Sequence, residues 1–131
     1  MFPKEVLVGV FISKAVYEIN IIRDDSYKIG YAVLCSIAIR ADEKFLKDIH
    51  RTLGQYNIKS KLSLVENPSR PKPILRVSGI QNCRKVMELI PPHFSDANNS
   101  IENYRIVIAK LVNKEHLTLE GFDSIVTMRG I

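Results

Sequence analysis

The chain has 131 residues, of which 46% are hydrophobic and 25% are charged, so residues 1–131 are expected to form a single globular domain. Its 19 Lys and Arg against 14 Asp and Glu give a net charge of +5, a mild excess that suits an anionic partner without requiring one. No apolar run approaches the ~18 residues that span a membrane, and residues 6–12 lack the flanks of a signal peptide. We therefore expect an intracellular protein, cytoplasmic or in a nucleoid or organelle, with no membrane partner.

The N-terminal part of the sequence predicts a helix followed by a hairpin. Pro3 suits the first turn of a helix, and residues 6–12 are apolar almost all round, which predicts a buried helix. From Val16 the apolar residues recur with a period of two, typical of a strand, and residues 24–26 (Asp-Asp-Ser) predict a turn. A second strand is expected over Tyr31–Arg40, antiparallel to the first.

The alternation along these two strands sorts their side chains onto two faces. One face is apolar and suits the core: Tyr17, Ile19, Ile21, Val33, Cys35, Ile37 and Ile39. The other face mixes polar and small or apolar groups: Glu18, Asn20, Ile22, Ala32, Leu34, Ser36, Ala38 and Arg40.

The remaining sequence predicts a second helix and hairpin and then three helices. Asp42 is a favourable N-cap, and Gly54 is expected to end that helix. A third strand is predicted over residues 58–65 and a fourth over 74–78, joined by a loop with three prolines. Further helices are predicted over 81–90, over 101–111 and after Thr118, with a polar loop at 93–100.

This order of elements predicts an α+β protein of αββαββα organisation, with helices on one face of an antiparallel sheet. The other face is then exposed. The side chains expected on that exposed face are Glu18, Asn20, Asp24, Ser36, Arg40, Lys59, Lys61, Lys72, Arg76 and Ser78.

Three stretches in this order resemble the LAGLIDADG homing endonuclease family. They are VLVGVFISKAVYEINI at 6–21, SYKIGYAVLCSIAIRADEKFLKDIHRTLG at 26–54, and YRIVIAKLVNKEHLTLEGFDSIV at 104–126. The last is similar to the NKEHLT-x-EG ending of many members. The resemblance covers nearly the whole chain and implies the αββαββα half-unit of that family.

The resemblance also implies how such units pair and where they cut. Two units pair through their first helices, as a homodimer or within one longer chain, and Gly9, Ile12 and Ser13 are the matching positions here. Each helix ends in an acidic residue that coordinates Mg²⁺, and the match puts Lys14 at that position. We therefore expect no catalytic residue and no cofactor, with Mg²⁺ required only if cleavage is retained. Glu18, on the first strand, is the nearest carboxylate after the helix and the alternative candidate for the missing ligand.

In the family the exposed sheet face lies along the major groove of double-stranded DNA, which a two-stranded ribbon fits. By that resemblance the candidate DNA-binding residues are Asn20, Lys28, Ser36, Arg40, Lys59, Lys61, Arg70, Lys72 and Arg76. Apolar residues on the first hairpin weaken the expectation of base readout there and leave a protein partner open. They are Ile22, Ala32, Leu34 and Ala38.

The leading interpretation is thus a DNA-binding relative of these endonucleases that does not cut. The alternatives are an endonuclease that uses an unusual metal ligand or acidic residues of a partner chain, a protein-interaction module, and an RNA-binding variant.

Cys35 and Cys83 are interpreted as core residues in a reducing compartment, with a disulfide as the weaker alternative. His50, His93 and His116 lack the spacing of a zinc site.

Overall fold

The computed structural model describes residues 2–92 and 99–129. Helices and strands follow one another in the predicted order, and a short 3₁₀ helix precedes the last α-helix. In chain order they are α1 (Lys4–Ser13), β1 (Val16–Arg23), β2 (Tyr31–Arg40), α2 (Glu43–Gln55), β3 (Lys61–Ser63), β4 (Ile74–Ser78), α3 (Ile80–Leu89), α5 (Asn99–Val112), η1 (Glu115–Leu117) and α6 (Leu119–Arg129).

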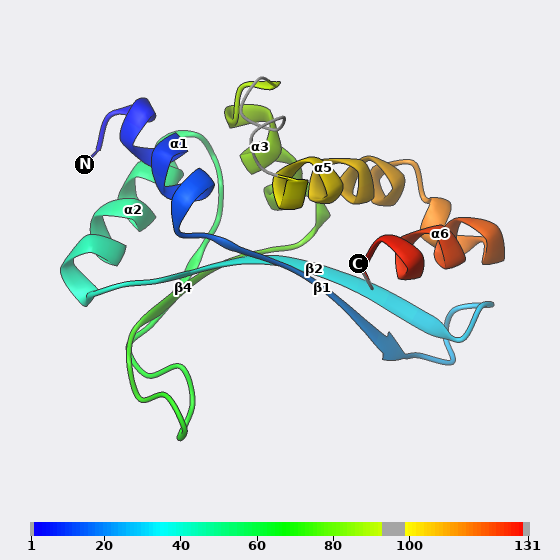
Figure 1. Ribbon diagram of the computed structural model, residues 1–131. Coiled ribbons are helices and arrows are strands. Elements are labelled where there is room, and N and C mark those ends of the chain that lie inside the picture. Colours follow the sequence, from blue (N-terminus) through cyan, green and yellow to red (C-terminus); the bar gives the residue numbers. More distant parts are fainter. Residues whose placement is uncertain (1, 93–98, 130–131) are drawn as a thin grey trace.

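The four strands form one antiparallel sheet in the order β1-β2-β4-β3. The helices of residues 2–92 and 99–129 all lie on one side of this sheet, and within these ranges its other side carries no helix (Figure 1). The predicted α+β class and αββαββα order are therefore confirmed. The helix-free side is called the outer face below.

The three longer strands have the predicted bounds, but β3 is much shorter than predicted. It spans only Lys61–Ser63, and its predicted first residue, Ile58, belongs instead to the cap of α2. Asn57 adopts the left-handed conformation, with φ of 58°, and its N–H donates to the carbonyl of Gly54. The N–H of Ile58 donates to the carbonyl of Leu53, which completes a Schellman motif.

The prediction that Gly54 ends α2 is therefore wrong, since the helix continues to Gln55. Ile58 buries its side chain in the core as part of that cap. Asp42 occupies the predicted N-cap position but makes no capping hydrogen bond with its side chain.

Two predictions nearer the C-terminus have different outcomes. Thr118 caps α6 as predicted, because its Oγ accepts a hydrogen bond from the N–H of Gly121 at 3.1 Å. The predicted polar loop 93–100 is wrong at its end, because residues 99 and 100 begin α5. Residues 93–98, which include His93, lie outside the described part of the chain.

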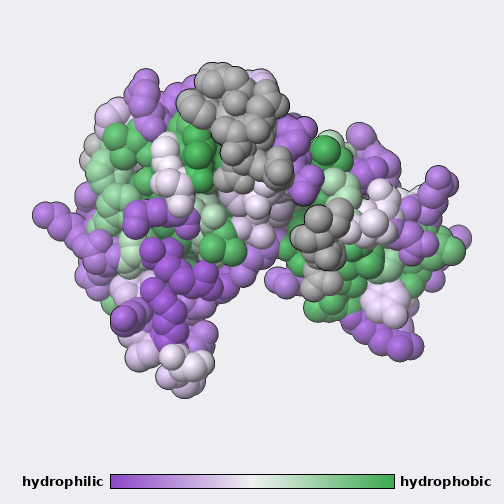
Figure 2. Space-filling view, in the orientation of Figure 1, coloured by the Kyte–Doolittle hydropathy of each residue, from purple (hydrophilic) through white to green (hydrophobic). Residues whose placement is uncertain are grey.

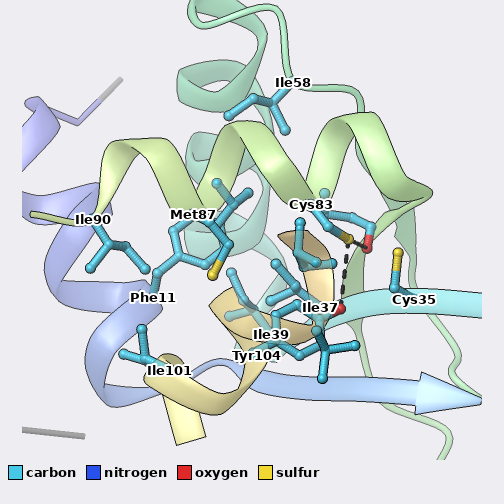
Figure 3. Close-up of a cluster of buried hydrophobic side chains, with 14 of the residues drawn as sticks. Phe11, Cys35, Ile37, Ile39, Ile58, Cys83, Met87, Ile90, Ile101 and Tyr104 are labelled. Carbon is cyan, nitrogen blue, oxygen red and sulfur yellow. Dashed lines mark hydrogen bonds between the residues drawn. The ribbon is translucent and has the colours of Figure 1, made fainter. Parts of the chain in front are cut away.

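The core lies between the inner face of the sheet and the helices (Figure 3). Phe11 of α1, Ile37 and Ile39 of β2 and Met87 of α3 are all buried within it. Cys35 and Cys83 are buried free thiols, so they are core residues as predicted, and the disulfide is not formed. No helix in the described ranges is long and apolar enough to cross a membrane.

A tyrosine hydroxyl fixes α5 to the sheet. Tyr104 is buried, and its hydroxyl donates to the carbonyl of Ser36 on β2 at 2.9 Å, while lying 3.2 Å from the carbonyl of Glu18 on β1. A buried hydroxyl needs such a partner, because leaving it unsatisfied costs about 1–3 kcal/mol. The bond holds α5 against the middle of β1 and β2.

The first helix is not buried all round, contrary to prediction. Leu7, Val10 and Phe11 face the core, whereas Val6 and Gly9 are exposed. One side of α1 is therefore an exposed surface made of apolar and small residues.

Candidate functional site

The register of the strands arranges the outer face in rows across the sheet. The first row begins at Val16, the first residue of β1, which lies opposite Ala38 of β2. Ala38 lies opposite Arg76 of β4, and Arg76 lies opposite Lys61 of β3. The next row contains Glu18, Ser36 and Ser78. Toward the hairpin turn follow the pairs Asn20 with Leu34 and Ile22 with Ala32. These rows confirm the predicted faces of β1 and β2 and the predicted places of Lys61, Arg76 and Ser78. Asp24 was also predicted on this face, but it lies beyond the end of β1.

Cations gather on the β3–β4 side of the outer face. Lys61 is exposed directly opposite Arg76. Lys72 is exposed in the loop between β3 and β4, which forms a hydrophilic projection at the lower left of Figure 2. This side of the face can attract an anionic partner.

Glu18 lies at the centre of the face and is already engaged. Its Oε1 accepts a hydrogen bond from the hydroxyl of Ser36 at 3.1 Å and lies 3.5 Å from Nε of Arg76. Ser36 is almost fully buried. Glu18 therefore offsets part of the charge of Arg76 and holds its guanidinium on the sheet.

A second carboxylate clamps the loop that follows β3. Glu66 accepts two hydrogen bonds from Arg40, from Nε and from one terminal nitrogen, each at 2.8 Å. It also accepts one from Arg70 at 3.0 Å. The Arg70 guanidinium further donates to the carbonyl of Pro73 at 3.1 Å. Only 10% of the Glu66 side chain is exposed, so this is a partly desolvated bidentate pair with a third member.

The loop is also hydrogen-bonded within itself. Asn67 and Arg70 exchange backbone hydrogen bonds, and the N–H of Glu66 donates to the carbonyl of Lys72. These hydrogen bonds and the fixed φ angles of Pro68, Pro71 and Pro73 restrict the conformations of the loop.

The clamp shifts the pKa of Glu66 strongly. Hydrogen bonds from Arg40, together with the charges of Arg40 and Arg70, lower the pKa of this carboxyl from 4.5 to about 2. The same hydrogen bonds raise the pKa of Arg40. Arg40 and Arg70 were predicted to bind DNA, and the structure shows that both are already paired with Glu66.

The β1–β2 side of the outer face has a different chemistry. Ile22 and Leu34 are 47% and 49% exposed, and the exposed amide of Asn20 lies directly opposite Leu34. Ala32 and Ala38 are buried. This half of the face is therefore a small apolar surface around one amide.

Besides Lys72, two further predicted lysines, Lys28 and Lys59, lie off the sheet. Lys59 precedes β3, and its backbone N–H donates to the side-chain oxygen of Asn82 at the start of α3. Lys28 is exposed in the turn between β1 and β2. Neither is therefore positioned by strand alternation.

The C-terminal end of α1 does not fit a divalent cation. Lys14 is exposed at the C-cap, flanked by Ser13 and Ala15, neither of which carries a carboxylate. The Ser13 hydroxyl donates to the carbonyl of Gly9 at 2.7 Å. Glu18 already accepts from Ser36 and pairs with Arg76. Across residues 2–92 and 99–129, no three His, Cys, Asp or Glu side chains form a group that could hold a metal ion.

The exposed side of α1 has free space around Gly9. Gly9 and Ser13 lie one turn apart, both exposed, with Ile12 half-buried beside them. A Cβ placed on Gly9 would meet no described atom within 4 Å, so packing within this chain does not require glycine there.

Sequence reasoning missed the two carboxylates that organise the face. From the sequence, Glu66 has no predicted role, and Glu18 is predicted only as a residue of the exposed face or a replacement ligand. Their partners lie 26 and 58 positions away in the sequence, at Arg40 and Arg76. Only the fold brings these charges together.

Solved structures with this fold are homing endonucleases. I-TnaI matches with a TM-score of 0.80 at 17% sequence identity, over 98% of this chain and 86% of its own. The LAGLIDADG homing endonuclease I-SmaMI, bound to cleaved DNA, matches with a TM-score of 0.77 at 17% identity, over 98% of this chain and 43% of its own. The chain has the LAGLIDADG homing-endonuclease fold.

The LAGLIDADG meganuclease I-CpaMI, bound to uncleaved DNA, has a TM-score of 0.74 at 18% identity, with coverage of 98% and 44%. The chain thus spans less than half the length of I-SmaMI and I-CpaMI. No protein-family model matches the sequence, and no curated protein matches it. At this identity, the likeness concerns the LAGLIDADG fold and not the chemistry of individual side chains.

The Glu66 clamp predicts an acid-dependent loss of stability. Because the folded pKa of about 2 lies below the ordinary 4.5, the stabilisation is complete above pH 4.5 and is lost as the pH falls toward 2. Glu66→Gln should therefore lower the urea midpoint at neutral pH. The difference from the unsubstituted protein should shrink as the pH is lowered from 4.5 to about 3.

Glu43→Gln is the matched control, since Glu43 forms only an exposed pair with Lys47 on α2. Its effect on the urea midpoint should be small at every pH. A difference between Glu66→Gln and the unsubstituted protein that stayed constant with pH would contradict the assignment of the clamp.

Proposed function

We propose that the chain binds double-stranded DNA with the outer face of its sheet and does not cut it. The observation that carries the binding proposal is the pair of cations, Lys61 and Arg76, opposite each other on β3 and β4. Side chains on neighbouring strands can enter the major groove, where arginine and lysine reach guanine acceptors or the flanking phosphates. The DNA-bound states of I-SmaMI and I-CpaMI, which share the fold, support this proposal.

Further contacts are proposed around this pair. Lys72 and Lys28 extend the basic surface at the two loops, and Lys59 adds a charge beside α3. Arg40 and Arg70 share their charge with Glu66, so we assign them first to holding the loop and second to phosphate contact.

The absence of cutting is proposed from the end of α1. Metal-assisted hydrolysis of a phosphodiester needs a cation held by oxygen ligands, which carboxylates supply. An ammonium group at Lys14 repels such a cation, and Glu18 is engaged by Ser36 and Arg76. Cutting with acids from a partner chain is the alternative, and the absence of nicking by the purified protein leaves only that version of cutting.

We also propose that residues 1–131 form one half-unit that pairs with a second copy through α1. The side of α1 formed by Gly9, Ile12 and Ser13 would meet its counterpart, because small residues one turn apart let two helices approach closely. The full-length DNA-bound relatives are more than twice as long as this chain, as expected if two units share one site.

Lys61→Ala should lower the affinity for DNA and make that affinity less sensitive to salt concentration. If Lys61 neutralises one phosphate, the slope of log affinity against log salt should become shallower by about 0.9. Fluorescence anisotropy with a labelled duplex at several salt concentrations measures this slope. Lys44→Ala, an exposed lysine of α2 on the helical side, is the matched control and should leave the slope unchanged. Failure of the unsubstituted protein to bind any duplex at low salt would refute the proposed function.

The purified protein should not nick supercoiled plasmid or a bound duplex with either Mg²⁺ or Mn²⁺. The reason is that Lys14 replaces the carboxylate that a metal would need at the end of α1. Nicking that disappears in Glu18→Gln would show that Glu18 serves as the ligand and would overturn this part of the proposal. Nicking that Glu18→Gln leaves intact would overturn it as well, in favour of a ligand elsewhere.

Gly9→Leu should abolish pairing of two copies without harming the fold. The site is open within the chain, and replacing a helical glycine with leucine stabilises a helix by up to about 1 kcal/mol. Sedimentation equilibrium should show a dimer for the unsubstituted protein and a monomer for Gly9→Leu. Gly54→Leu on α2, equally open, is the control and should remain dimeric. An unchanged dimer in Gly9→Leu would exclude pairing through this side of α1.

A further inference from the structure

The outer face divides into two halves of different chemistry. The β3–β4 half presents Lys61 and Arg76. In the β1–β2 half, the outer-face positions are Val16, Glu18, Asn20, Ile22, Ala32, Leu34, Ser36, Ala38 and Arg40. The one cation among these nine is Arg40, which lies at the far end of β2 and is paired with Glu66. A duplex lying along the sheet would therefore meet two different surfaces.

The β1–β2 half contains one compact group that can recognise a base pair. Asn20 is exposed opposite Leu34 on the neighbouring strand, and Ile22 follows on the same face of β1. Side chains directly opposite in an antiparallel pair lie about 5 Å apart, and those two positions along a strand lie about 7 Å apart. An amide is thus flanked by two branched aliphatic side chains, each nearly half exposed.

We propose that this group reads A·T base pairs, with Ile22 and Leu34 against thymine methyl groups and Asn20 on adenine. The inference rests on the proposed DNA-binding function and specifies the DNA sequences that this half of the face accepts. The cations of the β3–β4 half supply phosphate and guanine contacts.

The chemistry of the major groove supports A·T over G·C. Adenine offers an acceptor at N7 and a donor at N6, which one amide can satisfy together, and its partner thymine carries the only methyl group in the groove. A G·C pair has no methyl group, and its guanine acceptors need donors such as those of Arg or Lys. Apolar side chains against a G·C edge would leave polar groups without partners.

Neighbouring charges do not alter this assignment. Glu18 is engaged by Ser36 and Arg76, so it does not project as a free anion toward the groove. Arg23 lies near the turn but belongs to the opposite face of β1 and pairs with Asp25. Asn20 also interrupts the apolar cluster with an amide. A cluster that contains an amide fits the edge of a base pair better than it fits an apolar protein surface.

The test begins with selection of bound duplexes from a library with a randomised central region. The expected result is a run of A·T pairs at one side of the selected site. In the selected duplex each thymine of that run is then replaced by deoxyuridine, which removes only the methyl group. Affinity should fall about three- to fourfold for each methyl group that the protein contacts.

Variants assign the effect to the cluster. Ile22→Ser with Leu34→Ser should bind the thymine and deoxyuridine duplexes equally, and Asn20→Ala should lose the preference for adenine. Leu119→Ser is the matched control: this side chain is 68% exposed on α6, away from the sheet, and the loss of affinity on deoxyuridine substitution should persist. Urea midpoints verify that the substituted proteins remain folded.

The outcomes separate the two proposals. Binding to duplexes without an A·T run, or affinity that is indifferent to deoxyuridine, overturns the readout and leaves DNA binding standing. Loss of the methyl effect in Leu119→Ser as well as in the double variant also overturns it. Absence of binding to every duplex at low salt overturns both proposals, and the apolar cluster is then assigned to a protein partner.

Discussion

Because side chains alternate along a strand, the register of β2 against its two neighbours decides which residues reach the outer face. β2 pairs with β1 from Tyr31 to Ala38 and with β4 from Ser36 to Arg40. A slip of one residue on either side would bury Asn20 or Arg76 and expose core side chains. The Tyr104 hydroxyl, bonded where the two pairings overlap, holds this register from the helical side. The position of each candidate binding residue on the sheet therefore depends on β2.

The electrostatics of the face follow from that register. Counting residues suggests many free cations on the second hairpin, but the fold pairs Arg40 and Arg70 with Glu66 and sets Arg76 beside Glu18. Lys61 and Lys72 are exposed on β3 and on the loop that follows it. The outer face thus has fewer unpaired cations, in a smaller area, than composition implies. The apolar cluster on the first hairpin is a correspondingly larger part of the outer face.

Much of this architecture can be predicted from sequence because period-two patterns and turn residues are local signals. The bounds of β1, β2 and β4 and the faces of the first hairpin follow from them. The shortness of β3 does not, since Asn57 ends α2 through backbone geometry that its neighbours do not reveal. Nor does the exposed side of α1, because a helix that is apolar all round carries no directional signal. The two carboxylate clamps require partners that only tertiary structure brings together.

The clamped loop between β3 and β4 has a consequence for the thermodynamics of association. A loop that becomes ordered on contact with its partner loses conformational entropy at that moment, and this loss reduces the affinity. Here Glu66, three prolines and the Asn67–Arg70 turn have already ordered the backbone before any partner arrives. The backbone of the projection is therefore preorganised, and the proposed contact with a partner would cost little additional backbone entropy. In this respect the stability of the loop and the proposed affinity of the surface depend on the same carboxylate.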